Sequence, residues 1–284
     1  MTRPDSIDDS AAPLMEHLKE LRNRILISIG AYAVCFIIGY VMWQQIFNIL
    51  SHPMCQVMAD RGEECTLVLI KMQEGFFVAI RIALWGGFVL AFPIIAYQLW
   101  RFVAPGLYRS EKAAFLPFLV ASPVMFFIGA AFAYFVMLPF AFNFFLGFAD
   151  AFQKQAAEGG SALGAVPTGV VYQGSIEAYL SLTMTFVLAF GLCFQLPVLL
   201  TLMGRAGIIS SAGLKHTRKY AVVGILTVAA IVTPPDIMSQ MILFAVIYPL
   251  YEVSILLTAR FERQREAQMR ADGTWVEDDE EGAA

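Results

Sequence analysis

Residues Ala113–Phe145 read AAFLPFLVASPVMFFIGAAFAYFVMLPFAFNFF, a run without a single Asp, Glu, Lys or Arg. An α-helix needs about 20 apolar residues to cross the hydrocarbon core of a bilayer, so this run is long enough to cross with tilt. Pro117, Pro123 and Pro139 lie within it, and we expect the helix to bend because proline removes a helical hydrogen bond. A segment of this kind indicates a membrane protein.

Runs of the same kind recur along the chain. The 284 residues are 58% hydrophobic and 15% charged, whereas a soluble domain is about one quarter charged. Six apolar runs are visible on a window the width of a bilayer, and no internal repeat relates them. We therefore predict an all-α polytopic membrane protein with six transmembrane helices, at approximately residues 25–47, 82–100, 113–145, 178–203, 220–232 and 237–259.

These runs also define the domain organisation. We assign residues 1–261 to one six-span domain and residues 262–284 to an acidic cytoplasmic tail, because five consecutive acids occupy positions 277–281. A block of like charges is typical of a solvated, disordered segment. The first apolar run begins near Ile25 behind polar residues, so we expect it to be retained rather than cleaved as a signal peptide.

The fifth run is too short for an ordinary span. Only about 14 residues separate Lys219 from Pro234, which is roughly 21 Å of helix against a hydrocarbon core of about 30 Å. Two explanations remain open. Either the bilayer thins around this helix, or the rest of the protein shelters it.

The distribution of basic residues predicts the orientation in the membrane. With both termini on one side, that side holds 15 of the 19 Lys and Arg residues. Basic loops favour the cytoplasm, so we predict a multi-pass protein of the bacterial inner membrane with both termini cytoplasmic. The opposite side receives only Arg61, Lys71, Arg81 and Lys154.

Two of the four cysteines are candidates for a disulfide. Cys35 and Cys193 lie within apolar runs and are expected to pack as small hydrophobic residues. Cys55 and Cys65 share the first outside loop, residues 48–75, in an oxidising compartment if the orientation is right. We therefore predict that Cys55 and Cys65 are bonded.

The sequence offers little for catalysis. Its three histidines, His17, His52 and His216, are scattered over separate loops, without the spacing of a zinc site. Neither a nucleophile elbow nor a phosphate-binding glycine loop is present. We expect no enzymatic activity, no catalytic residues, no bound metal or cofactor, and no nucleic-acid partner.

Two polar residues lie within apolar runs. Gln195 is in the fourth run, and Glu252 is in the sixth, about eight residues before Arg260. Polar groups inside a membrane are costly, so they mark either a functional site or a hydrogen bond between helices. Both interpretations stay open for both residues.

The cytoplasmic surface carries two further acids of interest. Glu20 precedes the first span and Glu111 follows the second, where each has a structural explanation as well as a functional one. Glu20 has Arg24 four residues later as a helix partner, and Glu111 suits the start of a helix. Around Glu20 we expect an amphipathic helix that lies on the membrane, with one apolar face formed by Leu14, Leu18, Leu21 and Ile25.

Several short motifs occur in a characteristic order. Together they resemble the TatC family, the multi-spanning receptor subunit of the twin-arginine protein translocase, over residues 14–261. Each motif is weak alone, and the order is specific. The motifs are HLKELRNR at His17–Arg24, FP at Phe92–Pro93, YQLWRF at Tyr97–Phe102, APGLY at Ala104–Tyr108 with Glu111, FQLP at Phe194–Pro197 and TPPD at Thr233–Asp236.

The resemblance implies a fold and a function. The fold would be a concave, tilted six-helix scaffold with short fifth and sixth helices. The function would be to bind twin-arginine signal peptides of folded precursor proteins at the cytoplasmic face. Translocation would be driven by the proton-motive force, together with the single-span partners TatA and TatB, and the protein would self-associate.

The resemblance also implies residue roles. Glu20 and Glu111 match the positions that hold the arginine pair, and carboxylates suit guanidinium groups. Arg22, Phe102 and Pro105 complete this candidate signal-peptide site. The turn Pro234, Pro235 and Asp236 matches the last periplasmic loop of the family.

Gln195 departs from the family pattern, which often has Glu there. A glutamine cannot carry a proton, so we interpret Gln195 as a contact for a polar group on a partner helix at an edge formed by the short fifth and sixth spans. The alternative function is a secondary transporter for a small solute. That class usually has related halves with ionisable groups near the midplane, and the halves of this chain do not mirror each other.

Overall fold

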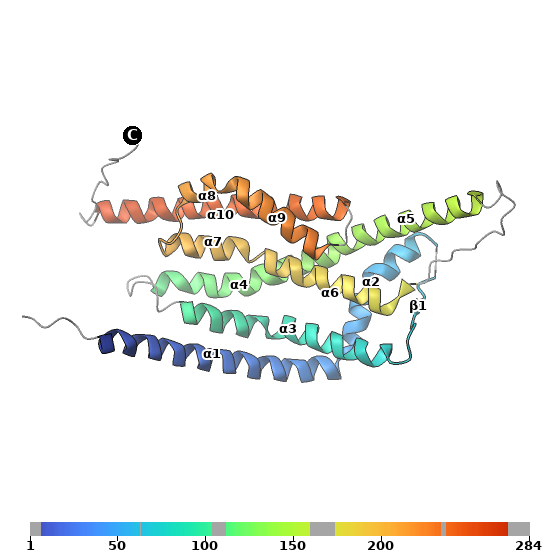
Figure 1. The fold of residues 1–284 in the computed structure, drawn as a ribbon, viewed down its shortest axis with the longest axis horizontal. Coiled ribbons are helices and arrows are strands. Elements are labelled where there is room, and N and C mark those ends of the chain that lie inside the picture. Colours follow the sequence, from blue (N-terminus) through green and yellow to red (C-terminus); the bar gives the residue numbers. More distant parts are fainter. Residues whose placement is uncertain (1–6, 63, 104–111, 160–173, 234–236, 272–284) are drawn as a thin grey trace, which may run out of the picture. The chain divides into compact units, whose positions relative to one another are not determined.

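The computed structural model describes residues 7–62, 64–103, 112–159, 174–233 and 237–271 (Figure 1). The chain divides into two compact units, Met1–Gly191 and Leu192–Ala284, which are described separately. Within the described residues the structure is almost entirely helical. The strands in these residues are a short parallel pair, β1 (Leu67–Val68) and β2 (Gly174–Ser175).

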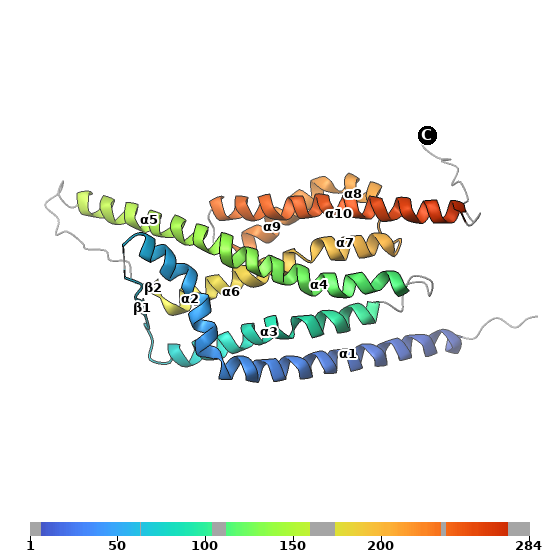
Figure 2. The same cartoon turned by 180° about the vertical axis from the view of Figure 1, so that it is seen from behind.

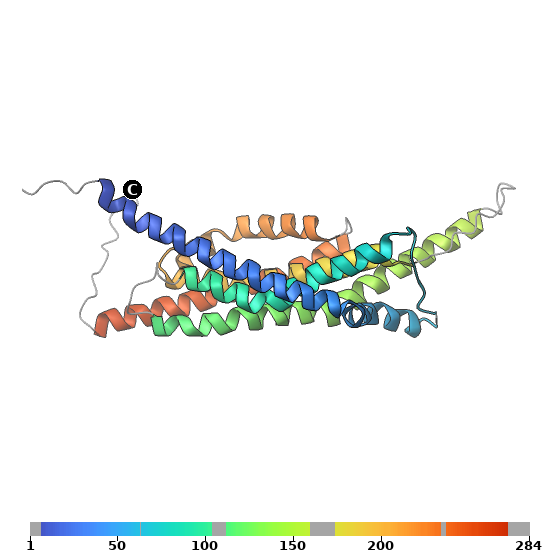
Figure 3. The same ribbon diagram turned by 90° about the horizontal axis from the view of Figure 1, so that it is seen from below.

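The first unit is built on the packing of α1 (Ile7–Val41) along α3 (Glu74–Val103). Figures 1 and 2 show the two helices side by side, and Figure 3 shows that they cross. Their closest approach depends on glycine, because a β-carbon at Gly87 would lie 2.8 Å from the Cα of Phe36. Small residues allow membrane helices to pack this closely.

The long run that opened the sequence forms one nearly continuous helical segment. It comprises α4 (Lys112–Phe132), a π-helical turn η3 (Ala133–Met137) and α5 (Leu138–Gly159). Of the three prolines at which we expect a bend, Pro117 and Pro123 lie inside α4, and Pro139 follows closely after the π-helical turn. Pro139 cannot donate to the carbonyl of Phe135, so the hydrogen bonds before it rearrange.

Three predicted boundaries in this unit were wrong. The first span ends at Val41 instead of near residue 47, and α2 (Trp43–Asp60) occupies much of the expected loop 48–75. Part of the second expected loop, 147–177, belongs to α5. The amphipathic segment around Glu20 is not a separate surface helix, because no strong helix breaker separates it from the span and α1 is continuous.

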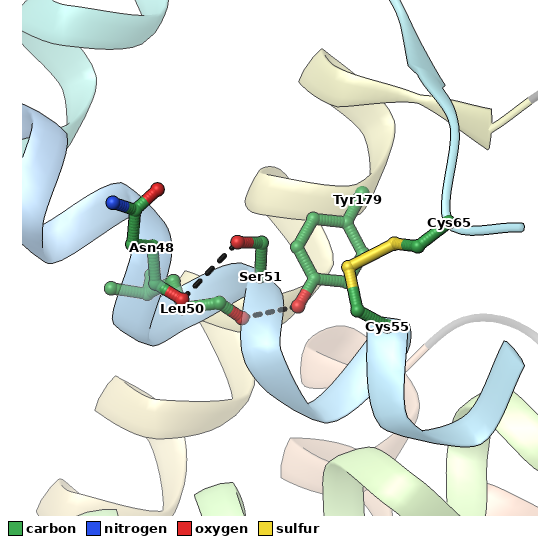
Figure 4. Close-up of a disulfide and its surroundings, with 6 residues drawn as sticks. All are labelled: Asn48, Leu50, Ser51, Cys55, Cys65 and Tyr179. Atoms are coloured by element: carbon green, nitrogen blue, oxygen red, sulfur yellow. Dashed lines mark hydrogen bonds between the residues drawn. A yellow bond between two sulfur atoms is a disulfide. The ribbon is translucent and has the colours of Figure 1, made fainter. Parts of the chain in front are cut away.

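Two tyrosines fasten α2 to its neighbours. Pro53 lies inside α2 and cannot donate to the carbonyl of Ile49, so that carbonyl is free to accept a hydrogen bond of 2.7 Å from the Tyr134 hydroxyl. The Tyr179 hydroxyl of α6 (Ile176–Cys193) donates to the next carbonyl, that of Leu50 (Figure 4). Pro53 thus frees the carbonyl of Ile49 for Tyr134, and the neighbouring carbonyl of Leu50 links α2 to α6.

A disulfide joins the end of α2 to the segment before β1. Cys55 and Cys65, ten residues apart in sequence, are bonded with a Cα–Cα distance of 5.0 Å (Figure 4). Cys35 and Cys193 are free and half-buried. The bond closes the connection that leads from α2 towards β1 and α3.

We expect mass spectrometry of the non-reduced protein to find the Cys55 and Cys65 peptides linked, and those of Cys35 and Cys193 alkylatable. Because the bond closes a short loop, replacing Cys55 and Cys65 by serine should lower stability by about 2–3 kcal/mol in the chain-entropy model. Free, alkylatable thiols at both positions in the isolated protein would show that the pairing does not form.

The buried carboxylate of Glu74 organises the same end of the unit. Its Oε2 accepts from the backbone N–H groups of Ile70 and Lys71 at 2.6 and 3.0 Å, and its Oε1 accepts from that of Glu177 at 3.1 Å. Glu177 in turn pairs with Lys71 at 3.6 Å and Arg81 at 3.3 Å. These bonds fix the loop beside β1 to the first turns of α3 and α6.

The second unit is organised around one long helix, α10 (Ile237–Ala271). α10 packs against α7 (Leu196–Arg205), α8 (Ser211–His216) and α9 (Arg218–Val232). The contact with α7 is close, because a β-carbon at Gly204 would lie 2.3 Å from Cγ2 of Thr258. The predicted fourth run is interrupted at Phe194 and Gln195, before Pro197, so that α6 and α7 are separate helices.

Five helical segments are long and apolar enough to cross a membrane by length and composition: Met15–Val41, Glu74–Phe102, Pro117–Ala151, Ile176–Arg205 and Ile237–Ala267. α9 adds the short fifth run, with 15 residues or roughly 22 Å. The described chain is therefore an all-α, polytopic membrane protein with helices at all six predicted runs. The concave shape of the whole scaffold stays a prediction.

The end of the six-span domain needs two corrections. α10 has 35 residues, so the sixth helix is not short, although its apolar part ends at Ala259. Residues 262–271, expected in a disordered tail, are helical and rich in Arg, Glu, Gln and Ala, which are good helix formers. The acidic run at 277–281 and the turn Pro234, Pro235 and Asp236 lie outside the described residues.

Candidate functional site

The most organised polar cluster on the predicted cytoplasmic end of the first unit involves Glu20, Arg24 and Gln98. Arg24 of α1 donates through Nη2 to Oε1 of Glu20 and through Nη1 to Oε1 of Gln98 on α3, both at 3.0 Å. Gln98 is buried, and the side chains of Arg24 and Glu20 are 18% and 34% exposed. Arg24 thus ties the two helices together and holds one oxygen of Glu20.

A pair of stacked aromatic rings joins the same two helices. The ring of His17 on α1 stacks on that of Phe102 on α3, with centroids 4.4 Å apart and an angle of 21° between the planes. Phe102 is half-buried. Glu20 and Phe102, which the sequence places in one candidate site, therefore belong to the same α1–α3 contact region.

Next to these groups, residues of α1 and α3 line an apolar groove of about 380 Å³. Arg24, Gln98 and Phe102 are among its lining residues, together with aliphatic side chains such as Ile25 and Leu99. The first unit thus has a buried amide and an aromatic ring in the lining of an apolar groove, and the carboxylate of Glu20 is bonded to Arg24, a third lining residue. This combination suits a peptide with cationic and apolar parts.

The other predicted members of the site differ in what the structure says of them. Arg22 is exposed on α1 and makes no ion pair with any residue of the described ranges. Pro105 and Glu111 fall between α3 and α4, outside the described residues. Within the part of the chain that is described, no group of three or more His, Cys, Asp or Glu side chains could hold a metal ion.

Comparison with known proteins identifies the family. The family model described as "Sec-independent protein translocase protein (TatC)" matches residues 16–245. The chain belongs to the TatC family. A TatC protein from Magnetococcus marinus is 41% identical over 95% of this chain and 93% of its own length, and that of Escherichia coli K12 is 34% identical over 89% and 90%.

A solved structure agrees with the TatC assignment. The crystal structure titled as the twin-arginine translocase receptor TatC is 36% identical, with a TM-score of 0.71, and the match covers 87% of this chain and all of that one. The resemblance that the motifs predicted is thereby confirmed for the family and the fold. The match to the family model begins at Glu16, so it includes the segment with Glu20.

Among the TatC helices of the second unit, Glu252 has a structural partner. Its Oε2 accepts from Nη2 of Arg218 at 2.7 Å, and its Oε1 accepts from the Tyr248 hydroxyl at 3.0 Å. Arg218 begins α9 and Glu252 lies on α10, so the ion pair joins the two helices. This arrangement gives Glu252 a structural role as a link between α9 and α10.

Gln195 occupies the break between α6 and α7. Its backbone carbonyl accepts the first hydrogen bond of α7, from Leu199 at 2.8 Å, and its side chain is half-buried. The residue already has an interaction within the chain beyond these backbone bonds. An amide has several donor and acceptor sites, so this leaves capacity for a further partner.

Sequence reasoning missed two residues of the α1–α3 contact region around Glu20, namely Gln98 and His17. Gln98 lies in the quoted YQLWRF motif, and His17 begins the quoted HLKELRNR motif. Their motifs were therefore a usable signal that both positions matter. Their contacts depend on the crossing of α1 and α3, which no sequence spacing reports.

Proposed function

We propose that this TatC protein is the receptor and core subunit of a twin-arginine translocase. It binds twin-arginine signal peptides of folded precursor proteins at the cytoplasmic face of the inner membrane. It acts with TatA and TatB, and the proton-motive force drives translocation. The observation that carries the proposal is the likeness to the twin-arginine translocase receptor over 87% of the chain.

The geometry around Glu20 supports a role in binding arginine. In the part of the chain that the structure describes, Oε1 of Glu20 accepts from Arg24, and Oε2 accepts no hydrogen bond. An incoming guanidinium can therefore pair with Oε2 while Arg24 keeps the carboxylate in place. Charge-assisted bonds of this kind are stronger than neutral ones, and partial burial reduces the competition from water.

The basic residues support the proposed topology. The loops and helix ends that contain 15 of the 19 Lys and Arg residues lie on the side of the two termini in the six-span arrangement. By the positive-inside rule, this asymmetry supports a cytoplasmic location for both termini. The disulfide between Cys55 and Cys65 then lies on the oxidising side.

Co-purification tests the receptor function most directly. The protein in detergent should retain a precursor with an intact arginine pair, and it should retain much less of the same precursor with two lysines, because lysine cannot form a bidentate pair. Failure to distinguish the two precursors would contradict the proposal. Uptake of a small solute into liposomes that contain only this protein would favour a secondary transporter instead.

The second unit suggests where a single-span partner docks. α9 has 15 residues, too few for an ordinary hydrocarbon core, so the bilayer beside α9 is expected to thin. Gln195 lies in the same unit and carries a polar group within the membrane. We therefore infer that the α9–α10 edge receives a partner helix and that Gln195 offers it a hydrogen bond.

Cysteine scanning should trap that partner at helical spacing when single cysteines are placed along residues 203–225 and 238–250. Gln195→Leu should weaken partner recruitment by about 0.6–2 kcal/mol, the range for hydrogen bonds between membrane helices, and leave signal-peptide binding intact. Thr185→Leu serves as a control, because Thr185 is a half-buried polar residue of α6 whose hydroxyl donates to the carbonyl of Ser181 in the same helix. Normal recruitment by Gln195→Leu would leave Gln195 with a structural role only.

A further inference from the structure

A groove with a basic rim lies along α10 in the second unit, far in sequence from the proposed signal-peptide site. Its volume is about 470 Å³, and seven of its eight lining residues come from α10. The eighth, Lys215, comes from α8. The α10 residues that line it are Ile255, Leu256, Ala259, Arg260, Arg263, Gln264 and Ala267.

The chemistry of the groove changes along its length. Ile255, Leu256 and Ala259 form its apolar part, and Leu256 is 69% exposed although it lies in a membrane-spanning segment. One turn further along α10 are the cations Arg260 and Arg263, and both are exposed. The groove therefore straddles the level at which the apolar sequence of α10 ends, which is where lipid headgroups meet acyl chains.

The cations of the rim are not neutralised by nearby acids. Among the described residues, Lys215, Arg260 and Arg263 take part in no ion pair. Two acids lie near them on α10: Glu262 accepts a hydrogen bond of 2.7 Å from the backbone N–H of Ser211, and Glu266 is in none of the ion pairs of the described residues. The rim thus offers three positive charges to an anion at the membrane surface.

We propose that this groove binds an anionic phospholipid of the surrounding leaflet. Its phosphate lies among Lys215, Arg260 and Arg263, and an acyl chain runs along Leu256. Charge complementarity selects an anion, and the apolar half of the groove selects a lipid over a soluble phosphate. Basic pockets beside membrane helices on the cytoplasmic side are suited to such headgroups. This inference is independent of signal-peptide binding.

Native mass spectrometry and titration in detergent micelles can test the proposal with phosphatidylglycerol as the probe and phosphatidylcholine as the reference lipid. The full-length protein should bind phosphatidylglycerol about tenfold more tightly, because each cation near an anionic headgroup contributes to affinity. The double variant Lys215→Gln with Arg260→Gln should lose most of this preference. Arg260→Lys, which keeps the charge, should retain it.

A matched control separates the groove from general surface charge. Lys219→Gln with Arg265→Gln removes one lysine and one arginine from the same unit, at positions that do not line the groove. This control should keep the preference for phosphatidylglycerol within about twofold. Equal losses in the control and the groove variant would overturn the proposal, as would equal binding of the two lipids by the unmodified protein.

The lipid proposal would also be overturned if either of two other occupants were found in the groove. If glycerol phosphate binds as tightly as phosphatidylglycerol, the groove is a site for a soluble phosphate. The second is the acidic run at 277–281, which follows α10 in sequence. If phosphatidylglycerol binds only after these five acids are changed to Gln and Asn, the tail occupies the groove and the lipid does not.

Discussion

Replacing Glu20 and Glu111 together by alanine is expected to remove most signal-peptide binding from a protein that remains folded. Each loss of a charge-assisted hydrogen bond to an arginine should cost about 1.5–3 kcal/mol, or about tenfold or more in affinity. The two acids belong to separate segments, so we expect their free-energy costs to add. The double variant should then bind the peptide roughly hundredfold more weakly. Cross-linking and titration with a twin-arginine peptide measure the change.

Glu16→Ala is the control for this experiment. Glu16 is an exposed acid one turn before Glu20 on α1, so the variant removes the same charge from nearly the same place. It should bind the peptide within about twofold of the unmodified protein, as expected for a surface charge. Unchanged peptide cross-linking in the double variant would show that these two carboxylates do not hold the arginine pair.

The spans were predictable because a bilayer imposes a length and a polarity on every helix that crosses it. Hydropathy reports the residues at membrane depth, however, and not the ends of helices. α3 therefore begins at Glu74, eight residues before the predicted run, and α10 continues past Ala259. α2 was expected to be a loop for a related reason, since an amphipathic helix has no long apolar run.

The polar contacts were predictable only where they are local. The spacing of Glu20 and Arg24 on one helix predicts their ion pair, and the structure has it at 3.0 Å. The bond from Arg24 to Gln98 joins residues 74 positions apart and requires the crossing of α1 and α3. No spacing in the sequence reports such a crossing.

Glu252 illustrates the same limit. An ionisable residue inside an apolar run was open to a functional or a structural interpretation. Its partner Arg218 lies 34 residues earlier and was predicted only as a residue of a cytoplasmic loop. The structure makes Arg218 the first residue of α9 and packs that helix against α10, which brings the two charges together.

Gly87→Leu should destabilise the first unit by separating α1 from α3. α1 packs mainly on α3, and few residues of its membrane span are buried. A side chain at Gly87 would meet the backbone of Phe36, at 2.8 Å from its Cα and 2.9 Å from its nitrogen. Backbone cannot move aside without displacing the helix, so we expect a cost of about 1–3 kcal/mol or more.

The consequences should reach the proposed site, because the Arg24–Gln98 bond and the His17–Phe102 stack both join α1 to α3. Cys35 is next to Phe36 and half-buried, so its alkylation should become faster in Gly87→Leu, while that of Cys193 should change little. Thermal unfolding in detergent and residue-resolved alkylation measure these two effects. Binding of a twin-arginine peptide should fall in parallel with them.

Gly30→Leu makes the same substitution on α1 at a position where a β-carbon would meet nothing within 4 Å. Leucine is a better helix former than glycine by almost 1 kcal/mol, so this control should be neutral or slightly stabilising. Equal stability of the two variants, with Cys35 equally protected in both, would mean that α1 is not held by the close approach at Gly87. The Arg24–Gln98 bond and the His17–Phe102 stack would then be the links between the two helices at the proposed site.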